Sequence, residues 1–193
     1  MNMDDEGAHA QIVSALRSGQ VIILPSDTLY GFSALLTSKD GFYRIVSIKG
    51  NGEERKFLHL ASGIAMVERY IASWGCADKD LLDSTWPAPF TAILPAGDNC
   101  PEWVGDTIAL RIPYFPPLLP IIEEAGEPVI STSVNRVGEP PLRDIEEIAR
   151  NFGKKVDLIV TSEEVPQTFS STIVDFTGDI PVLVREGSYP WEA

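Results

Sequence analysis

The chain has 193 residues, of which 44% are hydrophobic and 22% charged, so it is long enough to bury the core of one globular domain. A formal net charge of -13 opposes long-range attraction to a nucleic-acid backbone, and we expect any direct binding of RNA to be weak. Two cysteines and two histidines exclude a disulfide framework and give no cluster with zinc-ligand spacing, so we expect no metal site in the protein.

No apolar run approaches the ~20 residues that a membrane-spanning helix needs, which argues against a membrane protein. The acidic segment 1–6 lacks the basic and apolar regions of a signal peptide. We therefore expect a cytoplasmic protein whose cysteines stay reduced.

Hydrophobic periodicity divides the chain into short helices and strands. In chain order they are a helix over 8–17, strands over 21–24 and 31–36, a helix over 40–48, a strand over 57–61, a helix over 64–74, strands over 90–94 and 107–112, a helix over 118–125, a strand over 129–131, a helix over 145–152, and strands over 158–160, 172–176 and 182–184. This mixture predicts an α/β fold with an open, twisted sheet of parallel and antiparallel strands and flanking helices. We expect residues 1–7 to be a flexible acidic start and residues 8–190 to form a single domain.

The segment 24–31, Leu-Pro-Ser-Asp-Thr-Leu-Tyr-Gly, is the most informative part of the sequence. It ends an apolar strand with hydroxyls and a carboxylate, at the position where α/β sheets commonly bind ligands. The segments 86–91, 131–138 and 171–175, the last followed by 185–187, also combine hydroxyls, prolines or glycines with apolar flanks. Together these segments predict one polar pocket assembled from distant loops.

In this order, the segments resemble the YrdC/Sua5/YciO family of threonylcarbamoyl-adenylate synthases. The family's signatures are P-T-D-T-V-Y-G, K-x-R-P, W-P-G-P-x-T, V-R-x-P, S-A-N-x-S-G, S-T-x-V-D and R-x-G. This chain carries Pro25 to Gly31, Lys49, Trp86 to Thr91, Leu110 to Pro113, Ser133 to Asn135 with Gly138, Ser171 to Asp175, and Arg185 with Gly187. The resemblance extends over about residues 11–189, and it implies the short, single-domain form of the family with a deep concave site on the sheet.

The resemblance also implies a reaction. Members of the family combine L-threonine, bicarbonate and ATP into L-threonylcarbamoyl-adenylate and pyrophosphate. A downstream complex transfers the threonylcarbamoyl group to the adenosine at position 37 of tRNA. ATP is then a substrate, and Mg2+ is expected to be bound through its phosphates.

Carried over residue by residue, the family motifs imply specific site residues. Lys49 and Arg111 are the expected catalytic residues, and Thr28 and Arg111 are expected at the threonine site. The expected ATP-binding residues are Lys49, Arg55, Thr91, Ser133, Asn135, Ser171 and Arg185. Arg55 does not match a family motif; we expect it at ATP because it could compensate for an arginine that the K-x-R-P motif lacks here.

The residues themselves also allow purely structural roles. Lys49 could interact with the dipole at the end of its helix, and Arg111 could be a surface arginine. Ser133 and Asn135 could make local turns, since both often bond their own backbone. Thr91 could be a buried threonine, and for His59 we expect a core or edge histidine. Asp27 receives no assignment as a general base, because no base partner is evident in the sequence.

One departure from the family's pattern bears on function. Asn51 stands where K-x-R-P has its arginine, and asparagine supplies no charge for a triphosphate. We expect Arg55 or Lys56 to reach in from the same loop and compensate. In addition, Val137 replaces the second serine of S-A-N-x-S-G and cannot donate a hydrogen bond.

Two alternative functions therefore stay open beside the synthase. One is a nucleotide- or RNA-binding member of the same fold without synthase activity, which the missing arginine favours. The other is a relative that hydrolyses a nucleotide or an acyl-adenylate. Release of pyrophosphate that requires both threonine and bicarbonate separates the synthase from both.

Overall fold

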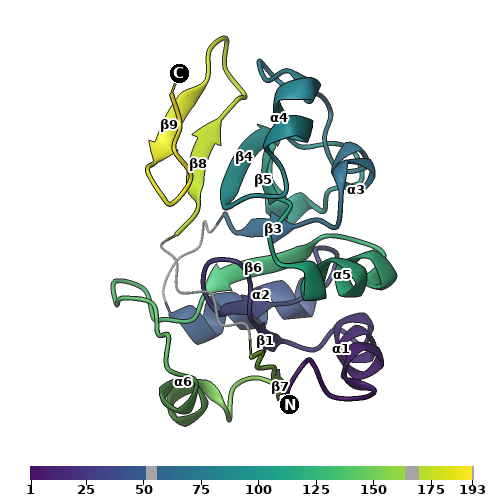
Figure 1. The fold of residues 1–193 in the computed structure, drawn as a ribbon, viewed down its shortest axis with the longest axis vertical. Helices are drawn as coiled ribbons and strands as arrows, with labels where there is room; N and C mark the ends of the chain where they lie inside the picture. Colours follow the sequence, from purple (N-terminus) through teal and green to yellow (C-terminus); the bar gives the residue numbers. More distant parts are fainter. Residues whose placement is uncertain (51–55, 164–169, 193) are drawn as a thin grey trace.

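A computed structural model describes residues 1–50, 56–163 and 170–192, whose strands form one sheet with helices packed against it (Figure 1). The helices are α1 (Ala8–Arg17), α2 (Lys39–Lys49), α3 (Ile64–Glu68), α4 (Lys79–Thr85), α5 (Leu119–Ala125) and α6 (Ile145–Phe152), with 3-10 turns η1 (Glu102–Val104) and η2 (Pro116–Leu118). The strands are β1 (Ile22–Leu24), β2 (Gly31–Ser33), β3 (Leu58–Leu60), β4 (Phe90–Pro95), β5 (Thr107–Arg111), β6 (Val129–Ser133), β7 (Leu158–Ile159), β8 (Thr172–Asp175) and β9 (Val182–Arg185).

The described strands are ordered β7-β1-β2-β6-β3-β5-β4-β8-β9 across the sheet. The pairs β1–β7, β3–β5 and β4–β8 are parallel, and the other neighbouring pairs are antiparallel. The predicted mixed α/β sheet with flanking helices is therefore confirmed. The order matters for the site because residues in or next to β5, β6 and β8, together with the loop after β1, line one cavity.

Strand β1 explains why the sheet needs helices on both sides. Its residues are apolar without alternation, and every one of them is buried. Ile22 and Leu24 belong to one hydrophobic cluster, whereas Val21 and Ile23 belong to a second cluster, because successive side chains of a strand point to opposite faces. A strand that is apolar on both faces has to lie in the interior.

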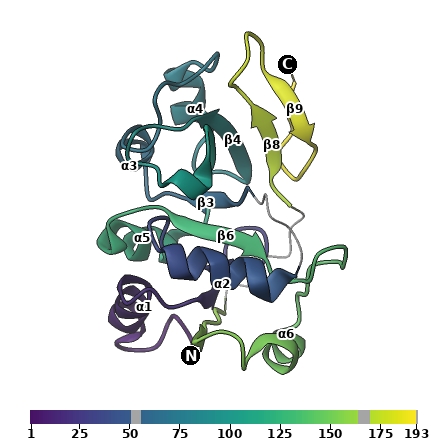
Figure 2. The ribbon, with the colours of Figure 1, turned by 180° about the vertical axis from the view of Figure 1, so that it is seen from behind.

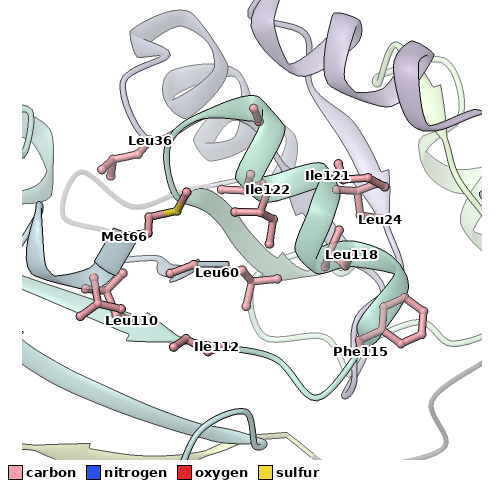
Figure 3. Close-up of a cluster of buried hydrophobic side chains, with 14 of the residues drawn as sticks. Leu24, Leu36, Leu60, Met66, Leu110, Ile112, Phe115, Leu118, Ile121 and Ile122 are labelled. Carbon is pink, nitrogen blue, oxygen red and sulfur yellow. The ribbon is translucent and has the colours of Figure 1, made fainter. Parts of the chain in front are cut away.

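The first cluster packs α1 and α5 against the sheet, and these two helices lie side by side in Figure 1. Figure 3 shows Leu118, Ile121 and Ile122 of the η2–α5 segment lying among Leu24 and Leu60 of the strands. The second cluster packs α2 and α6 on the other side, and Figure 2 shows α2 crossing in front of β6.

Polar caps set where several helices begin. The Ser38 side chain accepts a hydrogen bond from Gly41 N at the start of α2, and the Asp144 side chain accepts one from Glu147 N at the start of α6. Such caps satisfy amide groups that have no partner inside the helix. Gly126, with a φ of 93°, ends α5 in the left-handed conformation that favours glycine.

Two predicted helices differ from the structure. The helix expected over 64–74 ends at Glu68, because Tyr70 O accepts a hydrogen bond from Gly97 N and Ile71 forms a β-bridge with Ala96. The helix α4 was not predicted; only Leu82 of its residues is buried, so its sequence has little apolar periodicity. Elsewhere the predicted elements are present, with ends shifted by a few residues.

The acidic start, for which we expect flexibility, contacts the sheet through its first residues. Asn2 forms a parallel β-bridge with Thr161, Met3 N donates to Thr161 O at 2.8 Å, and the Met3 side chain is buried in the first cluster. These contacts join the start to the segment after β7, while its mobility stays a prediction. Within the described residues, no helix combines the length and the apolarity needed to cross a membrane.

Candidate active site

The loop that follows β1 is held in place by Ser26. Its Oγ donates to Leu29 O at 2.8 Å and accepts from Thr28 N at 3.3 Å. Both side chains, Ser26 and Thr28, are buried. The serine of the opening motif therefore makes the turn, and the turn aims the next two side chains, Asp27 and Thr28, toward the end of β5.

Arg111, at the end of β5, contacts both of those side chains. Its Nη1 donates to Thr28 Oγ1 at 3.1 Å, and its Nη2 lies 3.2 Å from Asp27 Oδ1. Asp27 Oδ2 in turn accepts a hydrogen bond from Tyr114 N at 3.1 Å. Arg111 is 1% exposed and Asp27 is 9% exposed, so this is a buried ion pair.

Burial lowers the pKa of the Arg111 guanidinium from its ordinary value, while the Asp27 carboxylate acts in the opposite direction and Arg185 adds to the lowering. An arginine nevertheless stays protonated at neutral pH. Arg111 Nε is buried and has no hydrogen-bond acceptor among the described residues. An acceptor supplied by a bound carboxylate or phosphate would satisfy this N–H, and the planar fork of arginine suits such groups.

A cavity of about 250 Å3 lies along this face of the sheet. Apolar side chains of the central and edge strands line part of it: Leu58, Ile93, Ala109, Ile173 and Val184. Hydroxyl groups line another part, from Thr28, Ser131, Thr132, Ser133, Ser170 and Ser171. The described lining residues include the cations Lys56, Arg111 and Arg185 and no aspartate or glutamate, so the cavity favours an anionic ligand with an apolar part.

Gly31, at the start of β2, allows β2 to lie close to its neighbour strand β6 at the cavity wall. A Cβ at this position would lie 2.8 Å from Ser131 Oγ and 3.4 Å from Thr132 O. Any larger residue would push against β6, which carries the serines of the cavity wall. The glycine that ends the opening motif is thus required by close approach of the two strands.

The far side of the cavity is built around Ser171. Its hydroxyl is 2.8 Å from Thr91 Oγ1 and accepts from Arg185 Nη2 at 3.1 Å. Arg185 also donates to Ser171 O from Nε at 3.1 Å and from Nη2 at 2.8 Å. Gly187 allows this packing, because a Cβ there would lie 2.3 Å from Ser170 O. Ser171 and Arg185 form part of the wall, while Thr91 is fully buried behind Ser171.

Lys49, the last residue of α2, lies beneath the loop after β6. Its Nζ donates to Ser133 O at 2.6 Å and to Asn135 Oδ1 at 2.8 Å, and Asn135 O lies 3.3 Å away. Asn135 Oδ1 also accepts from Ser133 Oγ at 2.7 Å, and Asn135 Nδ2 donates to Glu139 O. The Lys49 side chain is therefore buried in contacts that shape the loop carrying Ser133.

The structure brings five of the predicted residues to the cavity wall: Thr28, Arg111, Ser133, Ser171 and Arg185. Thr91, Lys49 and Asn135 contact those wall residues and do not line the cavity themselves. Arg55 lies outside the described residues, as does Asn51.

Sequence reasoning missed the partnership of Asp27 with Arg111, and it named Ser131 within the pocket segment 131–138 without giving it a role. The position of Asp27 within the opening motif was the available signal. His59 is buried away from the main cavity, beside Phe42 and Trp103. Burial lowers the pKa of His59 to about 4, against the effect of its bond to Ala109 O.

No group of three or more His, Cys, Asp or Glu side chains within the described ranges could hold a metal ion. The site's charged groups are instead arranged to meet anions. A divalent cation would come to such a site together with a phosphate-bearing ligand.

Comparisons with known proteins all point to one family. The family model Sua5/YciO/YrdC, described as "Telomere recombination", matches residues 14–187. A protein of Coxiella burnetii (strain RSA 493 / Nine Mile phase I), named threonylcarbamoyl-AMP synthase, is 31% identical over 172 residues, which cover 87% of this chain and 92% of that protein. The residues that the family model matches include all the strands that line the cavity.

Solved structures share the fold. Two structures of Sua5 from P. abyssi, one of them complexed with L-threonine, are 26% and 25% identical, cover 96% and 95% of this chain and have TM-scores of 0.89 and 0.86. This chain spans only 58% and 55% of those Sua5 chains. YciO of E. coli is 28% identical with a TM-score of 0.83, and 95% of this chain and 90% of that chain are covered.

Proposed function

The chain belongs to the Sua5/YciO/YrdC family, and on this premise we propose that it is an L-threonylcarbamoyladenylate synthase that uses L-threonine, bicarbonate and ATP. One observation carries the proposal: Arg111, buried in the wall of a cavity rich in hydroxyls and cations, bonds to Thr28 and is paired with Asp27 behind the wall. A Sua5 of the same fold was solved with L-threonine, which supports threonine as the amino-acid substrate.

The proposed reaction forms two bonds and releases two products. The threonine amine bonds to the carbon of bicarbonate, with loss of water, and a carbamate oxygen then bonds to the α-phosphorus of ATP. The bond between the α-phosphorus and the oxygen that links it to the β-phosphate breaks, and pyrophosphate leaves with the electron pair of that bond. In this scheme the enzyme is a nucleotidyltransferase, because an adenylyl group passes to the carbamate.

The residues divide between the two substrates. Arg111 and Thr28 bind threonine, with the guanidinium facing its carboxylate and the buried Nε supplying an N–H for it. Ser133, Ser171 and Arg185 bind the nucleotide, and the apolar strand residues receive its base. Much of the rate would come from holding weak nucleophiles close together, and cations would stabilise the charge that develops at phosphorus.

Other predicted site residues act within the same scheme. Lys49 and Asn135 hold the Ser133 loop in place for ATP, and Thr91 orients Ser171. Mg2+ would arrive on the ATP phosphates and screen their charge. The labile product would pass to a downstream complex that transfers the threonylcarbamoyl group to tRNA, in keeping with weak direct tRNA binding by a chain of net charge -13.

The direct test is release of pyrophosphate from ATP in the presence of bicarbonate, with and without L-threonine. The proposal expects release that depends on threonine and is reduced at least tenfold in Arg111→Lys, which keeps the charge and loses the fork. Serine and valine, offered in place of threonine, serve as matched controls for the amino acid. Release that is equal with and without threonine would contradict the proposal.

A second candidate is a nucleotide-binding member of the family that lacks synthase activity. The observation in its favour is Asn51, which stands where the family motif has an arginine. It expects ATP to bind without any threonine-dependent turnover, and Asn51→Arg would then be the first variant to assay for gain of activity.

A further inference from the structure

Lys56 is a cation of the cavity wall that matches no family motif. It precedes β3, and its Nζ donates to Thr107 Oγ1, at the start of β5, at 2.8 Å. The side chain is exposed, so its ammonium group is open to a ligand as well as to solvent. The hydroxyl of Thr107 restrains the direction in which this long side chain points.

The sheet register puts Lys56 beside the serine loop. Leu58 pairs with Ser131 of the antiparallel neighbour β6, and continuing this register by two residues puts the Lys56 backbone opposite Ser133. Ser133 O accepts a hydrogen bond from Lys49 Nζ. The Lys56 backbone is therefore opposite Ser133, while its ammonium group reaches to Thr107 on β5, the other neighbour of β3.

Lys56 is paired with no carboxylate in the ranges that the structure describes. Among the described residues that line the cavity there is also no carboxylate. Arg111, in contrast, is paired with Asp27 at the other end of β5. Thr107 and Arg111 are four residues apart on one strand, or roughly 13 Å, so Lys56 serves a different part of a ligand from Arg111.

We propose that Lys56 is a phosphate-binding residue of this site, which contacts the β- or γ-phosphate of ATP and supplies a cation in a chain whose K-x-R-P motif has Asn51 in place of arginine. The inference rests on the proposed use of ATP. It explains how a chain without the motif arginine keeps a further positive charge in the cavity wall. An ammonium group suits this task because it is a compact point charge that needs no fixed bidentate geometry.

The test compares nucleotides that differ only in phosphates. Binding of ATP and of AMP to the full chain is measured by calorimetry for wild type, Lys56→Gln, Lys56→Arg and the control Lys154→Gln, which removes an exposed lysine outside the cavity. Lys56→Gln is expected to weaken ATP binding about tenfold and to leave AMP binding within about twofold, since charge-assisted contacts to phosphate are lost only for ATP. Lys56→Arg and Lys154→Gln are expected to bind both nucleotides like wild type.

Two results would overturn the assignment: an unchanged affinity of Lys56→Gln for ATP, or an equal loss for ATP and AMP. The thermal unfolding midpoint of each variant shows whether it is folded, and an exposed lysine is not required for folding. Failure of the proposed function is a separate outcome. Wild type that binds ATP without threonine-dependent turnover would reject the synthase, while a selective loss of ATP binding in Lys56→Gln would still support the phosphate contact.

Discussion

Asp27 and Arg111, which are far apart in the sequence, form a buried ion pair with Arg111 Nη2 3.2 Å from Asp27 Oδ1. Asp27 is also anchored by Tyr114 N, three residues after Arg111, so the carboxylate fixes both the arginine and the loop behind it. The pair holds a cationic fork at the cavity wall in one orientation. This arrangement gives the opening motif a reason for its aspartate that does not involve proton transfer.

Asp27→Asn should weaken threonine use while ATP affinity stays within about twofold. Removing the carboxylate's charge lets the Arg111 guanidinium reorient, and we expect the KM for threonine to rise about tenfold. Asp179→Asn, on the exposed turn between β8 and β9, is the control for a lost surface carboxylate. An unchanged KM for threonine in Asp27→Asn would show that Asp27 does not position Arg111.

Asp27→Ala should reduce stability as well. Leaving a buried charge without its partner typically costs about 3–5 kcal/mol, so the free energy of unfolding should fall by an amount of that order. Urea denaturation followed by fluorescence measures it. A loss below about 1 kcal/mol would indicate that water or a rearranged neighbour compensates Arg111.

The two Thr28 variants Thr28→Val and Thr28→Ser separate the hydroxyl from the side-chain volume. Thr28 Oγ1 accepts from Arg111 Nη1, and valine removes this acceptor while keeping the shape. We expect Thr28→Val to raise the KM for threonine about tenfold and Thr28→Ser to stay close to wild type. A raised KM in Thr28→Ser with an unchanged KM in Thr28→Val would show that the methyl group matters and the hydrogen bond does not.

Thr91 should affect the nucleotide site through Ser171. Thr91→Val leaves the Ser171 hydroxyl without its fully buried partner, an expected loss of roughly 1–2 kcal/mol in stability. ATP affinity should fall by a few-fold in Thr91→Val and further in Ser171→Ala, with little added loss in the double variant. Additive effects on ATP affinity would mean that the two hydroxyls act independently.

His59 predicts a pH dependence of stability. Its pKa in the folded chain is about 4, against an ordinary value of 6.5, so below pH 6.5 the unfolded chain binds more protons than the folded chain. Stability from this residue is therefore full above about pH 6.5 and is lost as pH falls toward 4, by roughly 2 kcal/mol at pH 5. Urea denaturation of wild type and His59→Gln at pH 7 and pH 5 should show the smaller pH-dependent loss in the variant. Equal losses in both proteins would indicate that His59 is protonated in the folded chain without penalty.

The sequence predicted the fold well where apolar patterning decides the structure. The buried strand β1 and helices such as α1 and α6 follow directly from hydrophobic runs and periodicity. It failed at α4, where Leu82 alone is buried, and at the end of α3, where pairing of Ile71 with Ala96 replaces helical bonds. Such competition depends on tertiary contacts that no local pattern contains.

For the site, the order of the motifs was enough to predict one pocket, and in the structure the same cavity is lined by Thr28, Arg111, Ser133, Ser171 and Arg185. Motif order could not reveal that Thr91 stands behind Ser171 or that Lys49 is buried beneath the Ser133 loop, because these facts depend on side-chain direction in a twisted sheet. The expected compensation by Arg55 lies outside the described residues, whereas Lys56, the other residue considered, lines the cavity.

The most direct measurement of the central claim is the mass of the adenylate product. ATP, L-threonine and 13C-bicarbonate are incubated with the full chain, and the acid-labile product is analysed at once by mass spectrometry. The account predicts threonylcarbamoyl-adenylate that carries one 13C atom, formed together with pyrophosphate and absent when threonine is omitted. An adenylate without the label, or ADP and AMP as the only nucleotide products, would contradict it.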